Sequence, residues 1–243
     1  MDIQQHLPAY LERLHIKALN AMQLAALEAI ASQPELILLS NTGSGKTLAF
    51  LLSMLSLLDE HNPHTQALIM VPSRELVLQI DEVFRKMRTP FKVTLCYGGH
   101  KREIEEQNLV QAPVIIIGTA GRLADHIRRK NIETDSIHLI ILDEFDKSME
   151  LGFHEEMAFI MQSLNQVTHK ILTSATATDE LPPFYKLQQP HQLNYIIAGE
   201  EASNFALEMF TLFSPDKDKI NTLFNFLCYA NNRPCIVFCN HRD

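Results

Sequence analysis

Short hydrophobic runs alternate with longer amphipathic stretches along most of the chain. Each run has the length of a β-strand and is bounded by polar or turn-forming residues. Between the runs, hydrophobic residues recur with the period of a helix, most clearly in the face formed by Leu76, Val77, Ile80, Val83, Phe84 and Met87. The runs predict strands at Leu36–Leu39, Ala67–Val71, Val93–Tyr97, Val114–Ile117, Leu139–Leu142 and Ile171–Thr173.

This alternation of strands and helices predicts an α/β fold. Strands that are hydrophobic on both faces favour a parallel sheet that helices cover on both sides. Ligands of such sheets bind at the carboxyl ends of the strands. We therefore expect the functional residues to lie directly after the hydrophobic runs.

The pattern becomes irregular near residues 188–192, and a new unit begins beyond this point. There the sequence predicts a strand at Glu208–Phe213, a helix at Asp216–Tyr229 and a strand at Cys235–Cys239. A tail of roughly 40 residues is too small to form a domain by itself. We expect it to be the opening of a second α/β domain.

Composition and charge narrow the class of protein. Hydrophobic residues make up 46% of the 243 residues and charged residues 21%, which excludes a disordered or collagen-like chain. The net charge of −8 does not exclude nucleic acid, because a local basic face can still bind phosphates. Four cysteines are too few for a disulfide scaffold, and no hydrophobic run reaches the ~20 residues of a membrane span. With no visible secretory signal, we expect a soluble, cytoplasmic protein that does not bind membranes.

A glycine-rich loop follows the first predicted strand, with the sequence Ser40-Asn41-Thr42-Gly43-Ser44-Gly45-Lys46-Thr47. Its glycines let successive N–H groups point at an anion, and the following helix adds its positive N-terminus. Lys46 can then reach the β- and γ-phosphates of a nucleotide, and Thr47 can hold Mg²⁺. The strict pattern has glycine where Ser40 stands, and a plain turn before a buried helix is the alternative. Because the Gly-x-Gly-Lys-Thr spacing lies between a strand and a helix, it favours a phosphate-binding loop.

Three carboxylates follow the predicted strand Leu139–Leu142, in the sequence Asp143-Glu144-Phe145-Asp146. Carboxylates this close repel one another unless a cation lies between them. Asp143 is placed to hold Mg²⁺, and Glu144 to orient and deprotonate an attacking water. A solvated helix cap is the alternative, and the phosphate loop upstream makes it the weaker one.

Other chemistries lack their residues. A zinc-protease motif would need a second histidine where Ala158 follows His154-Glu155. Cys235 and Cys239 share a face of a predicted strand, and without further ligands they are expected to be core residues. No Asn-Lys-x-Asp element that would read guanine follows, and none of the histidines is assigned a catalytic role.

Further short segments stand in a fixed order: Pro72–Leu76, Gly98-Gly99, Thr119–Arg122, Ser174–Thr176 and Ile236–Asn240. With them, the phosphate loop and the acidic tetrad, the chain resembles the DEAD-box RNA helicases of superfamily 2. In this order the segments match motif Ia, the glycine doublet, motif Ib, motif III and motif IV of that family. The resemblance covers the first of its two RecA-like domains and the start of the second.

The resemblance implies a RecA-like P-loop NTPase domain, with a mostly parallel sheet and helices on both faces. It also implies an ATP-dependent RNA helicase that uses ATP and Mg²⁺. Glu144, Lys46 and Asp143 would be catalytic, and Thr47 and Asp143 would hold the metal ion. The residues expected to bind ATP are Gln23, Thr42, Gly43, Ser44, Gly45, Lys46 and Thr47.

The RNA-binding face of this family lies at the ends of its strands. N–H groups, hydroxyls and arginines there can follow a sugar–phosphate backbone without reading bases. The resemblance makes Asp146, Ser174 and Thr176 a coupling group, in which both hydroxyls bond towards Asp146 and link nucleotide state to RNA binding. A helix cap is the alternative for the two hydroxyls. The positions expected to bind RNA are Pro72, Arg74, Gly98, Gly99, Thr119, Gly121 and Arg122.

The chain departs from the family pattern at Ser73 and Ala120, where the family usually has threonine and proline, in the acidic tetrad, and in the segment before Gln23. Phe145 stands where the core tetrad has alanine, so its ring must find room. The adenine-reading Q motif is eroded before Gln23, although the spacing from Gln23 to Lys46 is preserved. Asn20-x-x-Gln23 is also a good capping box for a helix at Met22–Ala31. Both roles of Gln23 can hold at once, and adenine contact is favoured.

The expected organisation is an adenine-side segment at residues 1–27, a RecA-like domain at 28–198, and a linker with the truncated start of a second RecA-like domain at 199–243. Single-stranded or duplex RNA is the expected partner. An arginine finger from the second domain, beyond Asp243, would complete the site, so we expect very slow hydrolysis by this chain alone. A DNA-directed motor of superfamily 2 and a non-catalytic, ATP-gated RNA clamp remain alternative functions.

Overall fold

The computed structural model describes residues 3–99, 101–177, 181–196, 210–215, 218–230 and 233–238. The chain divides into two compact units, residues 1–198 and residues 199–243. All strands formed by the described residues belong to the first unit. In these ranges, no helix combines the length and the apolar character needed to cross a membrane.

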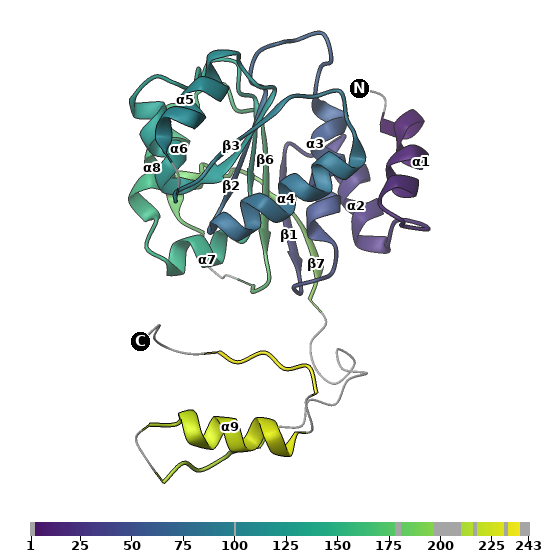
Figure 1. Ribbon diagram of the computed structural model, residues 1–243. Helices are drawn as coiled ribbons and strands as arrows, with labels where there is room; N and C mark the ends of the chain where they lie inside the picture. The colour runs from purple at the N-terminus through teal and green to yellow at the C-terminus, as the bar shows by residue number, and fades with distance from the viewer. Residues whose placement is uncertain are drawn as a thin grey trace. The chain divides into compact units, whose positions relative to one another are not determined.

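The first unit is built on a seven-stranded sheet with the strand order β3-β4-β2-β5-β6-β1-β7 (Figure 1). Every neighbouring pair of strands runs parallel, which confirms the predicted α/β sheet. The strands are β1 (Glu35–Ser40), β2 (Ala67–Val71), β3 (Val93–Cys96), β4 (Ile115–Thr119), β5 (Leu139–Leu142), β6 (His169–Ser174) and β7 (His191–Tyr195).

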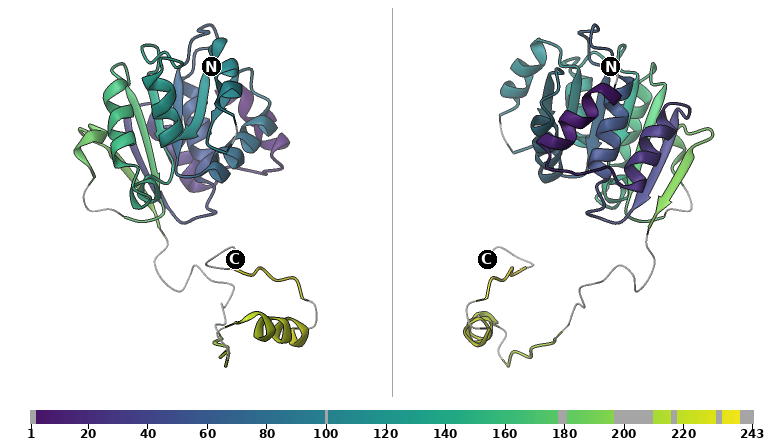
Figure 2. Two further views of the ribbon diagram at one scale, coloured as in Figure 1. Left: turned by 60° about the vertical axis from the view of Figure 1, so that its left-hand side comes forward. Right: turned by 90° about the vertical axis from the view of Figure 1, so that its right-hand side faces the viewer.

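Helices cover both faces of this sheet, as the views in Figures 1 and 2 show. Successive side chains of a strand point to opposite faces, so Leu36 and Leu38 belong to one core, and Ile37 and Leu39 to the other. The first core packs under α1 (Ile3–Arg13), α2 (Ala21–Ile30), α3 (Lys46–Leu57) and α4 (Arg74–Met87). The second packs under α5 (Arg102–Val110), α6 (Ala120–Arg128), α7 (Phe145–Glu150), α8 (His154–Ser163) and the short 3₁₀ turn Pro183–Tyr185.

The sequence pattern gives the central strands accurately and misses one edge strand. β2 and β5 have the predicted bounds, because every residue in them is buried. The sequence does not predict β7, which pairs only with β1 and has largely exposed, polar residues. An edge strand with few hydrophobic side chains is held in the sheet by backbone hydrogen bonds. The hydropathy pattern of the sequence does not record these bonds.

The second unit contains α9 (Ile220–Tyr229) within the helix predicted at Asp216–Tyr229; residues 216 and 217 lie outside the described residues. The strands predicted at Glu208–Phe213 and Cys235–Cys239 are wrong where the structure describes them, at 210–213 and 235–238. A strand needs a neighbour to pair with, and the described part of this unit offers none. Cys235 is therefore exposed rather than a core residue, and Cys239 lies outside the described residues.

Candidate nucleotide site and nucleic-acid face

The glycine-rich loop joins β1 to α3, as the sequence predicts. Gly43 and Gly45 have φ values of +80° and +91°, in the left-handed region that favours glycine. A Cβ at Gly45 would lie only 2.5 Å from Nε2 of Gln23. The loop therefore needs glycine at Gly45 for its backbone angle and for close packing, and it presents the N-terminus of α3.

The side chain of Lys46 is buried at the base of this loop. Its ammonium group donates to the carbonyl oxygens of Ser40 and Asn41. Burial lowers the pKa of Lys46, while the carboxylates of Asp143, Glu144 and Asp146 act in the opposite direction. The lysine of the loop and the acidic tetrad follow strands that both flank β6, and they lie at the same edge of the sheet.

Asp143 follows β5 and is held by a residue of the neighbouring strand. The Thr173 hydroxyl donates to Oδ1 of Asp143, and the N–H of Glu144 donates to Oγ1 of Thr173 at 3.2 Å. Burial raises the pKa of Asp143 to about 6, against the effects of Thr173 and Lys46. A buried carboxylate of this kind gains from a cation beside it.

Glu144 has a strained backbone. Its φ of +50° lies in the left-handed region, which is uncommon for a residue with a side chain. Such strain of about 1–3 kcal/mol is concentrated at functional sites. It turns the chain sharply between β5 and α7, and Glu144 is the residue before the first turn of that helix.

The third carboxylate, Asp146, is linked to the segment after β6. The Thr176 hydroxyl donates to Oδ2 of Asp146 at 2.8 Å. Among the described residues, the Ser174 hydroxyl bonds to Thr176 and not to Asp146: it donates to the carbonyl of Thr176 and accepts the N–H of Thr176. The structure thus brings Thr176 to the acidic tetrad and uses Ser174 to shape the turn that carries Thr176.

The side chain of Phe145 is buried in the second core, under α6 and α8. Its ring packs edge-on against Tyr185 at 5.8 Å, and Tyr185 in turn meets Phe184 at 4.6 Å. The larger residue is thus accommodated by aromatic packing against the 3₁₀ turn, and the side chain adds nothing to the polar site.

Gln23 ties the N-terminal segment to the phosphate loop. The predicted capping box is present, because Asn20 and Gln23 exchange two hydrogen bonds of 2.9 Å. In addition, Gln23 donates from Nε2 to the carbonyl of Gly45 at 3.2 Å, and Asn20 from Nδ2 to that of Ser44 at 3.0 Å. These bonds position the loop, and adenine contact by Gln23 remains a prediction.

The residues expected to bind RNA come together at the same edge of the sheet. β3 and β4 are neighbours, so the loop after β3 lies beside the start of α6, which follows β4 directly. A hollow of about 320 Å³ opens there, lined by Gly98, Gly99, Thr119, Gly121, Arg122 and Asp125.

Arg74 and Pro72 follow β2, the other neighbour of β4. Arg74 is exposed and places its guanidinium 5.3 Å from the ring centre of Tyr97. Gly99 has a φ of +97°, and a Cβ there would lie 2.9 Å from Nη1 of Arg74. Pro72 is buried and so bounds this face without presenting a side chain to it.

Sequence reasoning missed three residues of this region. Thr173 was assigned to a hydrophobic strand, although a hydroxyl at the end of a strand beside the acidic tetrad was a usable signal. Glu105 and His126 gave no signal, because each stands among charged residues of a helix that looks solvated. Only the packing of α5 against β3 and α6 reveals that both are buried.

Comparisons with known proteins agree with this geometry. Residues 20–182 match the family model described as DEAD/DEAH box helicase. Eukaryotic initiation factor 4A of Caenorhabditis elegans is 27% identical over 92% of this chain and 56% of its own length. The ATP-dependent rRNA helicase RRP3 of Encephalitozoon cuniculi is 32% identical over 89% of this chain and 55% of its own length. The chain thus spans about half the length of these relatives.

A solved structure supports the fold. The crystal structure of a DEAD box protein from the hyperthermophile Methanococcus jannaschii matches 72% of this chain and 48% of that chain, with a TM-score of 0.65 and 27% identity. This likeness confirms the predicted RecA-like α/β fold.

Proposed function

The chain belongs to the DEAD/DEAH box helicase family, and on this premise we propose that it is the ATP-binding core of an ATP-dependent RNA helicase. The observation that carries the proposal is that Lys46 and the three carboxylates of the tetrad follow β1 and β5, which both flank β6 in parallel, so that they lie at one edge of the sheet. A phosphate-binding lysine beside an acidic tetrad is the arrangement that nucleotide hydrolysis requires.

The donor set also fits Mg²⁺, which prefers oxygen ligands. Asp143 is buried with a raised pKa, and Oδ1 of Asp146 is buried without a hydrogen-bond partner in the described structure. Thr47 and Asp143 would hold the ion, which would neutralise negative charge on the phosphates.

The residues of the chain then take the following roles. Lys46 exchanges the carbonyl oxygens of Ser40 and Asn41 for the β- and γ-phosphates, and the positive N-terminus of α3 favours the same anion. Glu144 orients the attacking water and accepts its proton. Gln23 contacts the adenine, and the bond between Thr176 and Asp146 passes the nucleotide state to the RNA-binding face.

RNA is the proposed polymer because a relative, RRP3 of Encephalitozoon cuniculi, is named an ATP-dependent rRNA helicase. The RNA backbone would run along the hollow between the loop after β3 and the start of α6, contacting Arg74, Gly98, Gly99, Thr119, Gly121 and Arg122 beside Pro72. In this family a second RecA-like domain supplies an arginine finger worth about 10³–10⁵ in rate. We also propose that residues 1–27 form the adenine side of the site, and that residues 199–243 are a linker and the start of that second domain. The cytoplasmic location stays a prediction from the sequence.

The test is calorimetric titration of the chain with ATP and with GTP, each with Mg²⁺. We expect ATP to bind more tightly than GTP, Lys46→Ala to remove binding, and Gln23→Ala to remove the preference for adenine. Lys147→Ala, which breaks only an exposed pair with Glu150, should bind ATP normally. Equal binding of ATP by the unmodified chain and Lys46→Ala would refute the site. Stimulation of hydrolysis by DNA rather than RNA would favour the DNA-directed alternative.

A further inference from the structure

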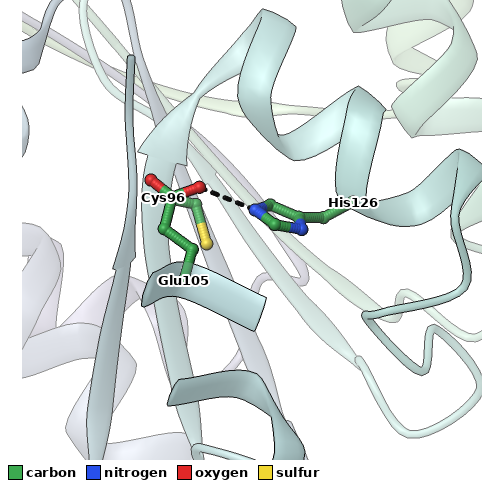
Figure 3. Close-up of side chains that lie close together, drawn as sticks. All are labelled: Cys96, Glu105 and His126. Carbon is green, nitrogen blue, oxygen red and sulfur yellow. Dashed lines mark hydrogen bonds and ion pairs between the residues drawn. The ribbon is translucent and has the colours of Figure 1, made fainter. Parts of the chain in front are cut away.

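A single buried carboxylate lies directly behind the proposed RNA-binding face. Glu105, on α5, is 1% exposed. Its Oε1 accepts the N–H of Tyr97 at 2.8 Å. Its Oε2 lies 2.8 Å from Nε of Arg122 and 2.7 Å from Nε2 of His126. Figure 3 shows the side chains of Glu105 and His126 pointing toward each other from different elements.

The same corner contains the three kinds of side chain that bind transition metals. The ligand atoms of Cys96, Glu105 and His126 lie within 4.8 Å of one another (Figure 3). Burial, however, raises the pKa of the Cys96 thiol, whereas a metal requires the thiolate. The guanidinium of Arg122 also lies against the carboxylate oxygen that a cation would need.

The histidine is satisfied without a metal. Nδ1 of His126 lies 3.1 Å from Nδ2 of Asn131, an amide nitrogen, which can only donate. Nδ1 is therefore the acceptor, and Nε2 carries the proton that it donates to Glu105. The ring thus has a partner at each nitrogen, and the arrangement is that of a hydrogen-bonded network.

Glu105 connects the parts of the face that must act together. Tyr97 directly precedes Gly98-Gly99, and its ring packs against Arg74. Arg122 lines the hollow from the first turn of α6. The side chain of Glu105, which does not itself line the hollow, thus holds the loop after β3, the start of α6 and, through Tyr97, the arginine after β2.

We propose that Glu105 is a positioning residue of the RNA-binding face, with His126 as its support. Its carboxylate fixes Arg122 and the Gly98-Gly99 loop in the geometry that a phosphate backbone requires. This inference rests on the proposed function. Without the carboxylate, Arg122 can swing towards solvent or Asp125, and RNA binding must then include the cost of ordering it.

The test compares two buried glutamates. Glu105→Gln keeps the shape and removes the charge. The matched control is Glu35→Gln: Glu35 is 7% exposed, pairs with Lys170 at 2.8 Å and accepts the N–H groups of Gln188 and Gln189. Because Glu35 begins β1, it lies at the opposite edge of the sheet from the proposed RNA-binding face.

The measurement is fluorescence anisotropy of a labelled single-stranded polyuridine RNA with the 243-residue chain, at several salt concentrations. For Glu105→Gln we expect RNA affinity to fall roughly tenfold, the size of one charge-assisted hydrogen bond. The slope of log K against log salt should flatten by about 0.7 for one lost phosphate contact. ATP affinity should stay unchanged, and Glu35→Gln should keep both the RNA affinity and the slope.

Three results would overturn the inference. The first is a folded Glu105→Gln variant with unchanged RNA affinity and salt slope. If circular dichroism shows that this variant does not fold, Glu105→Asp is measured in its place and judged by the same outcomes. The second is one zinc ion per purified chain that is lost in Cys96→Ser, which would make the corner a metal site. The third is failure of the unmodified chain to bind RNA, which would also remove the proposed RNA function, whereas the first result leaves that function intact.

Discussion

The Thr176 hydroxyl donates a 2.8 Å hydrogen bond to Oδ2 of Asp146, which joins the segment after β6 to the first turn of α7. The other oxygen of Asp146, Oδ1, is buried and has no partner in the described structure. One oxygen of this carboxylate is therefore fixed by the segment after β6. Under the proposed function, a change at the nucleotide site would reach that segment through Asp146, beside the separate link from Asp143 to Thr173 of β6.

Replacing Thr176 by valine tests this connection. Thr176→Val keeps the shape and removes the bond, so nucleotide should no longer affect RNA binding. We expect a non-hydrolysable ATP analogue to raise the RNA affinity of the unmodified chain at least about fivefold, the lower end of allosteric coupling, and that of the variant by less than about twofold. Anisotropy with and without the analogue measures this effect.

The control for that change is Thr168→Val. Thr168 precedes the other end of β6, and its hydroxyl bonds the carbonyl of His138 at 3.2 Å. The variant loses a similar hydrogen bond far from the acidic tetrad, so its coupling should be normal. Equal coupling in Thr176→Val and the unmodified chain would show that this bond carries no signal.

Three glycine-to-alanine changes separate backbone strain from steric overlap. Gly43→Ala introduces strain alone, because nothing lies within 4 Å of the added Cβ, whereas Gly45→Ala adds a 2.5 Å approach to Gln23. Gly121 lies in α6 with free space around it, where alanine gains helix propensity.

In urea unfolding we expect a loss of about 1–2 kcal/mol for Gly43→Ala, a larger loss for Gly45→Ala, and a gain of up to about 1 kcal/mol for Gly121→Ala. When Gln23 is also replaced by alanine, the difference in unfolding free energy between Gly43→Ala and Gly45→Ala should become smaller. If Gly45→Ala were no worse than Gly43→Ala, the contact between Gln23 and the phosphate loop would be unimportant for folding.

The sequence predicts most of this fold because the central strands are buried on both faces. β2 and β5 could be located to the residue, since hydrophobic runs end where burial ends. The sequence does not predict β7, because this exposed edge strand is specified by its pairing with β1 rather than by hydropathy. The strands expected in the second unit failed for a related reason: a hydrophobic run becomes a strand only where a partner strand exists.

The candidate site was predictable where the chemistry needs fixed spacing, and unpredictable where it depends on packing. The phosphate loop and the acidic tetrad can be recognised in the sequence because phosphate and metal binding require particular residues in a particular order. Glu105 and His126 cannot be recognised in this way, because the charged residues around Glu105 are typical of a solvent-exposed helix face. Their burial arises only when α5 and α6 pack together over β3 and β4, which no local pattern records.

Phe145 should matter for stability and little for nucleotide binding. The ring is 2% exposed and packs on Tyr185 inside the second core. Phe145→Ala should therefore cost about 3–5 kcal/mol of unfolding free energy by leaving a cavity, and Phe145→Leu about 1 kcal/mol. Calorimetry at low temperature should show that both variants bind ATP with an affinity within about threefold of that of the unmodified chain. A much larger loss of ATP affinity would mean that the Phe145 ring acts at the nucleotide site.

Glu35 should give the chain part of its sensitivity to acid. Burial acts to raise the pKa of Glu35, but the bonds from Lys170 and from the N–H groups of Gln188 and Gln189 outweigh it and hold the pKa below its ordinary value. The folded state then binds this proton less readily than the unfolded state. The stabilisation is thus fully present above the ordinary pKa of a glutamate and is lost as pH falls through the lower, folded-state value.

Urea unfolding of the chain and of Glu35→Gln between pH 7 and pH 3 measures this contribution. At pH 7 the variant should be less stable by roughly 3–5 kcal/mol, because Lys170 loses its carboxylate partner and keeps the carbonyl oxygen of Lys186. The difference should shrink as the pH falls, since a protonated glutamate and a glutamine are nearly equivalent there. Glu150→Gln breaks an exposed pair with Lys147 and should differ by less than about 1 kcal/mol at every pH. A difference for Glu35→Gln that stays constant down to pH 3 would mean that packing, and not charge, is what Glu35 contributes at the start of β1.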